Sequence, residues 1–511
     1  MNAVKDLFGL KAQNQQPSKL DEDDIYPASF FDDTKTFRDM MLLWTFHFND
    51  VLDPDKLHGS LARLLEIGDW RKIGGRQRIN AQGKLEFHVP KTFTPERPAL
   101  KYSHKVFDMK IEDHPLGKKF PKVAGKPSLH IGSHAFKEFA ATSDDAVDGS
   151  DLLIGDKPQM SLNIVSFNDA TLVSLVFCHT LMDAGGLQAL LQNWSLVLAG
   201  RESEVSPVLV ARDDIARAIA KGLVDDEDLG KSTQDEELKI APKLLSGLQM
   251  LIFGIRFLWD LFWYGTAESR SIFLPKTTMD RLRREAMDEI TASPSTTEVE
   301  RPFISEGDVI SAWTAKRVAE SDSRQLPVSI INAVNLRYRF KSLTQSTGVY
   351  VQNLSLCAFT FVSAAAARGP LGPIALANRK HLVDQITQPQ IRALLRTLIA
   401  ETEKGKDVTL FGESNMRLVV ISNWTKAELT QAADFSSAVV RQGEGHETRK
   451  NSLGQMTQVY PSMPKESIMS KNVMAIKGKD NEGNYWLDGR FATRTWLKFE
   501  DEIERLGRYE I

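Results

Sequence analysis

The sequence predicts a mixed α and β fold, because segments typical of strands alternate with segments typical of helices along the 511 residues. The composition is 42% hydrophobic and 26% charged, which is ordinary for globular proteins and is enough for large cores. We find no short-period repeat and no low-complexity tract. At about 100–200 residues per domain, the length of 511 residues suggests roughly two to four domains.

In chain order, the first clear helix covers residues 53–68. Asp53 can cap this helix, Pro54 suits its first turn, and Gly68 ends it. Residues 161–167 and 171–179 are rich in β-formers and lie on either side of a short polar segment, so they predict a hairpin. A helix is expected to follow and to end at Gly200.

The second half of the chain shows the same alternation. Ser305 and Asp308 form a capping-box pattern at the start of a helix. Strands are expected over 328–340, 349–363 and 408–424, with helical sequence between the last two. A final hairpin is predicted to turn at Glu482 and Gly483.

Charge and cysteine content exclude several classes of protein. The net charge is -3 and no basic stripe with aromatic residues is visible, so we expect no nucleic-acid partner. Cys178 and Cys357 both lie in apolar runs, which argues against a disulfide framework or a structural zinc site and favours a reducing compartment. The first 25 residues lack the apolar segment of a signal peptide and predict a disordered lead-in. We therefore expect a cytoplasmic protein.

His179 ends an apolar strand and is followed by a tight turn and a helix. A histidine there can act as a general base, since its pKa lies near neutral pH. Asp183 is close enough to shape the turn or cap the helix, and Gly185 and Gly186 allow close backbone approach. Cys178 should point to the opposite face of the strand. The alternative is a structural histidine with Asp183 as an ordinary first-turn acid.

The residues from His179 to Gly185 resemble the HxxxDG motif of the BAHD acyltransferases and their chloramphenicol-acetyltransferase-like relatives. Other segments resemble that family in the same order, most closely its fungal, trichothecene acetyltransferase-like members. These segments are Trp70 to Arg76, residues 307–313, the R-x-R and Y-x-G-N region with Arg337, Tyr350 and Asn353, and the stretch with Ser422, Trp424, Asp434 and Phe435 that leads into DFGWG.

The resemblance implies two similar domains with an active-site tunnel between them. The expected division is a lead-in over 1–25, an N-terminal domain over 26–215 that carries HxxxD, a crossover over 216–270 and a C-terminal domain over 271–511. A monomer is expected.

The resemblance also implies an acyl-CoA-dependent O-acyltransferase that acts on a hydroxyl of a secondary metabolite, with acetyl-CoA as the expected co-substrate. His179 would be the general base, and no covalent intermediate, metal or bound cofactor is required. Trp424, with Ser422 nearby, would supply oxyanion donors. Asp183 would orient the turn and pair with Arg337, and Gly185 and Asp434 would give structural support.

Two alternatives stay open. One is N-acyl or condensation-type transfer, or transfer from an acyl carrier protein; the other is a relative that only binds small molecules. Cys178 stands where condensation domains carry a second histidine, which weakens the condensation reading. The chain also departs from the family at Ala184, where glycine is usual, and at 436–438, where DFGWG is degraded.

An apolar segment lies at 244–264 within the crossover, and its length of about 21 residues could span a bilayer. A spanning helix would place the two halves of one active site on opposite sides of a membrane. We therefore predict a non-spanning helix in which Arg256 and Asp260 are spaced to pair. Its broad apolar face either packs on the protein or lies in a membrane surface.

Overall fold

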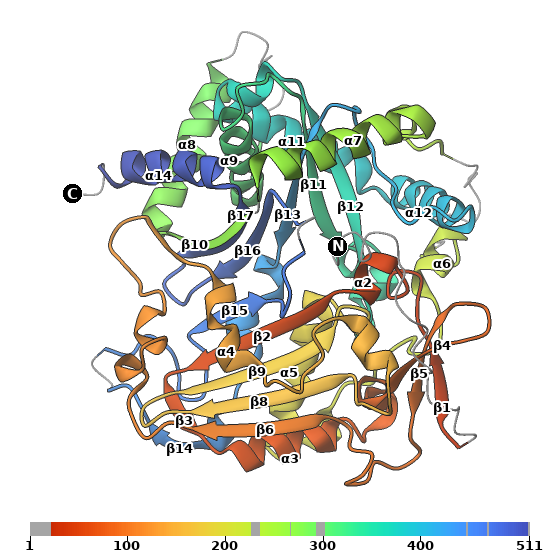
Figure 1. Ribbon diagram of the computed structural model, residues 1–511, viewed down its shortest axis with the longest axis vertical. Helices are drawn as coiled ribbons and strands as arrows, with labels where there is room; N and C mark the ends of the chain where they lie inside the picture. The colour runs from red at the N-terminus through yellow and green to blue at the C-terminus, as the bar shows by residue number, and fades with distance from the viewer. Residues whose placement is uncertain are drawn as a thin grey trace.

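Two β-sheets form the centres of two halves of the protein, one above the other in Figure 1. The computed structural model describes residues 22–225, 236–265, 267–292, 302–445, 448–467 and 470–508. Each sheet is covered by helices, so the predicted mixed α and β class with two similar domains is confirmed. Most of the lead-in expected over 1–25 lies outside the described residues, but Asp24 and Ile25 belong to a strand that pairs with Val89 and His88.

The sheet of the first half contains the predicted hairpin. Its strand order is β15-β2-β9-β8-β6. The strands are β2 (Met41–Phe48), β6 (Lys101–Val106), β8 (Met160–Ser166), β9 (Thr171–Cys178) and β15 (Gln458–Ser462). Every residue of β8 and β9 is buried, because both faces of the sheet are covered. Cys178 lies in the core on one of these faces, as predicted.

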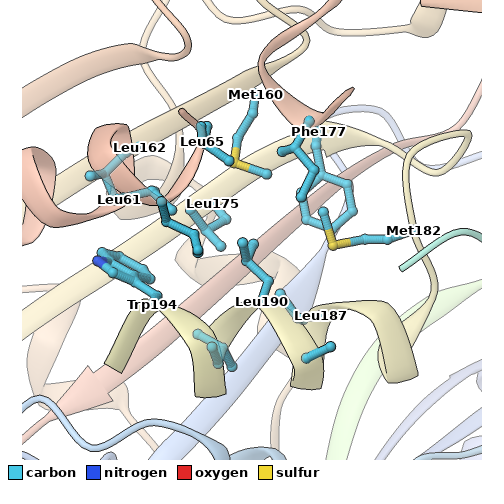
Figure 2. Packing of buried hydrophobic residues seen from close by; sticks show 14 of the residues in the cluster. Leu61, Leu65, Met160, Leu162, Leu175, Phe177, Met182, Leu187, Leu190 and Trp194 are labelled. Atoms are coloured by element: carbon cyan, nitrogen blue, oxygen red, sulfur yellow. The ribbon is translucent and has the colours of Figure 1, made fainter. Parts of the chain in front are cut away.

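Two helices cover the other face of this sheet. Asp53 caps α3 (Pro54–Leu64), as predicted, and α5 (Ala184–Leu198) packs beside it. Figure 2 shows side chains from both helices meeting those of β8 and β9. The labelled residues of this cluster are Leu61, Leu65, Met160, Leu162, Leu175, Phe177, Met182, Leu187, Leu190 and Trp194. This packing fixes the start of α5 directly after the strand that leads to His179.

The sheet of the second half has the strand order β12-β11-β13-β16-β17-β10-β7. Its strands are β7 (Ser128–Ile131), β10 (Glu268–Leu274), β11 (Val328–Asn335), β12 (Ser355–Val362), β13 (Arg417–Asn423), β16 (Val473–Lys479) and β17 (Tyr485–Phe491). One face packs on α8 (Lys276–Thr291), α9 (Glu306–Glu320), α11 (Leu371–Gln385) and α14 (Thr493–Gly507). The other face packs on α6 (Ile215–Ala220) and α12 (Gln388–Glu403).

The two halves exchange strands. β15 comes late in the chain but pairs with β2 in the first sheet, and β7 comes early but pairs with β10 in the second. A smaller pairing joins β3 (Asp50–Leu52) to β14 (Val439–Gln442). A third sheet, in the order β1-β5-β4, uses β1 (Asp24–Pro27), β4 (Arg76–Ile79) and β5 (Leu85–Val89). The exchange means that neither sheet is built from one continuous part of the chain.

The crossover contains the expected apolar helix, α7 (Gly247–Tyr264), while residues 226–235 and 266 lie outside the described part. The inner side of α7 rests on the second half through Phe253, which packs with Leu245 and Met416. Among the helices that the structure describes, none combines the length and the hydropathy of a membrane-spanning segment. The expected pair between Arg256 and Asp260 is wrong, because Asp260 binds Arg324 and Arg417 instead.

Candidate active site

His179 is held at the end of β9 by its main chain and by one aromatic ring. Its N–H donates to the carbonyl of Met40 at 2.7 Å, and its own carbonyl accepts from Asn353 Nδ2 at 2.7 Å. Its ring stacks on Phe37, with centroids 3.9 Å apart and planes 3° from parallel. Phe37 belongs to α2 (Lys35–Arg38) and was not indicated by the sequence analysis. The Phe37 ring therefore covers one face of the imidazole and restricts its orientation.

The surroundings of His179 favour the neutral ring. Burial lowers the pKa of His179 below its ordinary 6.5, and the charge of Asp183 and a hydrogen bond with Asn353 oppose this only in part. Its Nδ1 is buried and makes no hydrogen bond to any residue that the structure describes. A neutral imidazole at pH 7 is the form that can accept a proton.

The Asp183 side chain contacts the start of α5 and a segment of the second half of the protein. It caps α5 by accepting from the N–H of Gly186 at 3.0 Å. It also forms a two-point ion pair with Arg337, at 3.0 Å and 2.9 Å, and accepts from the N–H of Leu354 at 2.9 Å. Burial alone would raise the pKa of Asp183, but Arg337 and these hydrogen bonds outweigh it and lower the pKa. The carboxylate stays charged and braces the turn.

Arg337 and the paired glycines make this contact between the halves close. Arg337 Nε donates to the carbonyl of Tyr350 at 3.0 Å, and Nη2 donates to that of Gln352 at 2.7 Å. A Cβ atom at Gly185 would lie 2.8 Å from Arg337 Nη1, and one at Gly186 would lie 2.0 Å from the carbonyl oxygen of Val351. Only glycine lets α5 begin against this segment. The displacement of the family's glycine from 184 to 185 and 186 therefore has a local steric reason.

Ser422 and Trp424 lie at the end of β13. Trp424 Nε1 donates to Ser422 Oγ at 2.7 Å, and the Trp424 ring packs against Trp44 of the first half at 4.8 Å between centroids. The indole N–H is therefore engaged within the protein. Because Ser422 Oγ is the acceptor here, its own hydroxyl proton remains able to point to a second acceptor.

The segment 434–438, which stands in place of DFGWG, holds a loop against α5. The N–H of Asp434 donates to Ser195 Oγ at 2.9 Å, and the Asp434 side chain accepts from the N–H of Ser436 at 3.1 Å. The next residue, Phe435, is fully buried and contacts the rings of Phe48 and Trp194. The loop therefore contacts α5 through the Phe435 ring and through the turn at Asp434.

A buried network behind His179 was missed by the sequence analysis. Asp32 is fully buried and accepts from the Asn353 main-chain N–H at 2.9 Å and from its side-chain amide at 2.8 Å. Lys72 Nζ lies 3.9 Å from Asp32. Burial raises the pKa of Asp32, and the charge of Lys72 opposes this. Lys72 and Asn353 lay in segments that resembled the family, but no pattern linked either of them to Asp32.

No group of three or more His, Cys, Asp or Glu side chains able to hold a metal ion occurs within the ranges the structure describes. His179 and Asp183 follow β9 in the first half, and Ser422 and Trp424 lie at the end of β13 in the second half. An imidazole can transfer a proton, and a hydroxyl and an indole can donate hydrogen bonds to an oxyanion.

Fungal acetyltransferases are similar in sequence to this chain along nearly its whole length. No family model matches it. It is 36% identical over 492 residues to O-acetyltransferase PaAT-2 of Phomopsis amygdali, covering 95% of this chain and 98% of the relative. It is 32% identical over 500 residues to acetyltransferase pyiB of Pyricularia grisea, covering 96% and 95%.

Solved structures agree in fold. TRI101 of F. sporotrichioides, complexed with coenzyme A and T-2, aligns with a TM-score of 0.63 and 16% identity, over 95% of this chain and 98% of that one. Vinorine synthase aligns with a TM-score of 0.56 and 13% identity, over 97% and 98%. With relatives above 30% identity along almost its full length, the chain belongs to the BAHD-type acyltransferases, in their fungal acetyltransferase branch.

Proposed function

We propose that this protein is an acyl-CoA-dependent O-acyltransferase that moves an acetyl group from acetyl-CoA to a hydroxyl of a secondary metabolite. The observation that carries the proposal is the placement of His179. Its ring is kept neutral by burial and fixed against Phe37, at the seam where Asp183 joins Arg337 of the other half. The named relatives support the same class of reaction.

The proposed reaction needs one base and one oxyanion donor. His179 takes the proton of the acceptor hydroxyl while that oxygen attacks the thioester carbonyl. The tetrahedral oxyanion accepts a hydrogen bond from the Ser422 hydroxyl, whose oxygen is polarised by the indole N–H of Trp424. When the C–S bond breaks, the protonated His179 returns the proton to the CoA sulfur. The products are an ester and free CoA, so atoms and charge balance.

Asp183 has a positioning role in this scheme. Its ion pair with Arg337 and its cap on α5 hold the turn that carries His179. Gly185 and Asp434 support the same turn and the loop behind α5. None of these residues needs to exchange a proton.

We further propose a cytoplasmic monomer with the division given by the sequence: an N-terminal domain over 26–215, a crossover over 216–270 and a C-terminal domain over 271–511, which share one active-site tunnel. Peripheral membrane contact through 244–264 belongs to the same proposal. The close packing of Trp424 on Trp44 across the halves supports the shared site.

The test is release of free thiol from acetyl-CoA in the presence of pooled alcohols, with mass spectrometry of the products. We expect His179→Ala to lower the rate by about 10²–10⁴ at an unchanged thermal midpoint. A matched control is His58→Ala, because the His58 ring also stacks on an aromatic ring, Tyr102, at 4.1 Å between centroids. If His179→Ala kept full activity, or if amides alone were formed, the proposal would be overturned.

A further inference from the structure

The stretch of chain over 29–40 contacts His179 at the main chain and at the ring, and it also carries a buried carboxylate behind the base. The Met40 carbonyl accepts from the His179 N–H at 2.7 Å. The Phe37 ring stacks on the imidazole, with centroids 3.9 Å apart. Asp32 lies in the turn that precedes these two residues and is fully buried. A charged side chain in the interior requires partners, and those of Asp32 lead to the base.

Asn353 connects Asp32 to His179. Its Nδ2 donates to the His179 carbonyl at 2.7 Å and to Asp32 Oδ1 at 2.8 Å. Its main-chain N–H donates to the same Asp32 oxygen at 2.9 Å. Because both hydrogens of this buried amide are engaged, the amide cannot turn without losing hydrogen bonds that water does not replace. The position of the His179 carbonyl therefore depends on Asp32.

The neighbours of Asp32 favour a carboxylate over a carboxylic acid. Oδ1 accepts from two N–H groups of Asn353, and Oδ2 accepts from the Ser29 N–H at 3.3 Å. Lys72 Nζ lies 3.9 Å from Oδ2. A proton on either oxygen would face one of these donors. Burial raises the pKa of Asp32, and the charge of Lys72 and the hydrogen bonds oppose it. A charged acceptor holds the Asn353 amide more strongly than a neutral one.

Two carboxylates of the first half hold adjacent residues of the second half. The N–H of Leu354 donates to Asp183 at 2.9 Å, and the N–H of Asn353 donates to Asp32 at 2.9 Å. Asp183 braces the turn after His179, whereas the contact of Asp32 leads back to the His179 carbonyl. With its N–H and its carbonyl both bound, the main chain of His179 fixes the direction in which the imidazole projects.

We propose that Asp32 is a positioning residue for acyl transfer, which acts through Asn353 to hold the main chain of His179 so that the imidazole meets the acceptor hydroxyl. The inference rests on the proposed function and adds to it a second buried acid outside the HxxxD motif. Asp32 exchanges no proton with the substrate, because the Asn353 amide stands between them and does not titrate. A displacement of about 1 Å at a reacting group can cost about a hundredfold in rate.

The experiment measures kcat and KM by thiol release from acetyl-CoA for Asp32→Asn, Asn353→Ala and the double variant, each well below its thermal midpoint. Asp32→Asn keeps the size of the side chain but turns an N–H group toward existing donors. We expect kcat to fall about tenfold to a hundredfold, with the KM for acetyl-CoA unchanged within about twofold, because the buried Asp32 acts on the base and not on binding.

The double variant separates positioning from general support of the fold. If Asp32 acts through Asn353, then Asp32→Asn/Asn353→Ala should be no slower than Asn353→Ala alone, within about twofold. Should Asp32→Asn fail to fold because Lys72 loses its counter-charge, Asp32→Asn/Lys72→Met removes both charges and takes its place, with the same expected fall in kcat.

The matched control is Asp50→Asn. Asp50 is also fully buried, and it accepts from the Gly454 N–H and from Arg449 Nη1, both at 2.8 Å. Its carbonyl accepts from Thr171 Oγ1, at the opposite end of β9 from His179. We expect Asp50→Asn to lower the thermal midpoint and to keep the kcat of the wild type.

Several results would overturn the inference. They are a folded Asp32→Asn with the kcat of the wild type, a loss that appears in KM alone, and losses that multiply in the double variant. An active wild type with an equally active Asp32→Asn overturns only the role of Asp32. A wild type that releases no thiol with any alcohol overturns the proposed function, and the positioning role with it.

Discussion

The charge state of His179 depends on its immediate neighbours. Since burial lowers its pKa below 6.5, the neutral base persists to acidic pH, and the acid limb of kcat/KM should lie below 6.5. Phe37→Ala opens one face of the ring to water, which weakens the burial effect, raises the pKa and moves the limb upward. Phe37→Tyr keeps the stacked ring and should leave the limb in place. A limb that does not move in Phe37→Ala would exclude this role.

Asp183 should behave as a brace. Asp183→Asn can still cap α5, but it leaves Arg337 without its carboxylate partner. Breaking a buried pair in this way costs about 3–5 kcal/mol, and the displaced turn should slow turnover roughly tenfold to a hundredfold. Thermal unfolding and thiol release measure the two effects.

The double variant Asp183→Asn/Arg337→Gln provides the check on Asp183. It removes both charges, so it should recover part of the lost stability relative to Asp183→Asn alone. A strong loss of activity at unchanged stability in Asp183→Asn would contradict the bracing role and favour a direct part in proton transfer.

At this residue scale, the resemblance to the family singled out His179, Asp183 and Arg337, and the structure joins Asp183 to Arg337 in the expected ion pair. Phe37 and Asp32 could not be found in this way. Both reach the site from a segment about 140 residues before His179 along the chain, and only the folded sheet brings them there.

Among the elements, the start of α5 depends on glycine for its close contact with the second half. Gly186→Ala would place a Cβ atom 2.0 Å from the carbonyl oxygen of Val351, so the helix or the facing segment must shift. We expect a loss of about 1–3 kcal/mol and a slower reaction, measured by denaturant unfolding and thiol release. Gly59→Ala is the control, because this glycine of α3 has open space around it and alanine there should be neutral or stabilising by about 0.5–1 kcal/mol. Equal effects of the two changes would refute the steric account.

The elements themselves were largely predictable from local pattern. Three predictions that depend only on residues close together in the sequence are confirmed. They are the hairpin of β8 and β9, the capped helix α3, and the capping box of Ser305 and Asp308. For α7 the apolar pattern predicted the helix but left open which way its apolar face turned. Asp260 shows why: its partners Arg324 and Arg417 are distant in sequence, so the nearby Arg256 was the wrong choice.

On the scale of the whole molecule, the exchange of strands could not be read from the sequence. β15 and β7 carry no signal of which sheet they join, because strand pairing is decided by contacts between distant segments. The resemblance to the family implied two similar halves, and the alignment with solved structures confirms that fold. The exchange adds a mechanical link between the halves in both directions.

This link predicts that the two halves cannot work apart. A chain cut within the crossover at 216–270 leaves the first half without β15 beside β2, and the second half without β7 beside β10. Each sheet then exposes an unpaired edge that favours aggregation, and the seam of Asp183 with Arg337 is lost. We expect each fragment alone to be inactive in the thiol-release assay and poorly soluble, whereas fragments expressed together in one cell should pair and recover activity, because each supplies the strand that the other lacks. An N-terminal fragment that is active alone would show that the second half is dispensable, and the shared site would have to be abandoned.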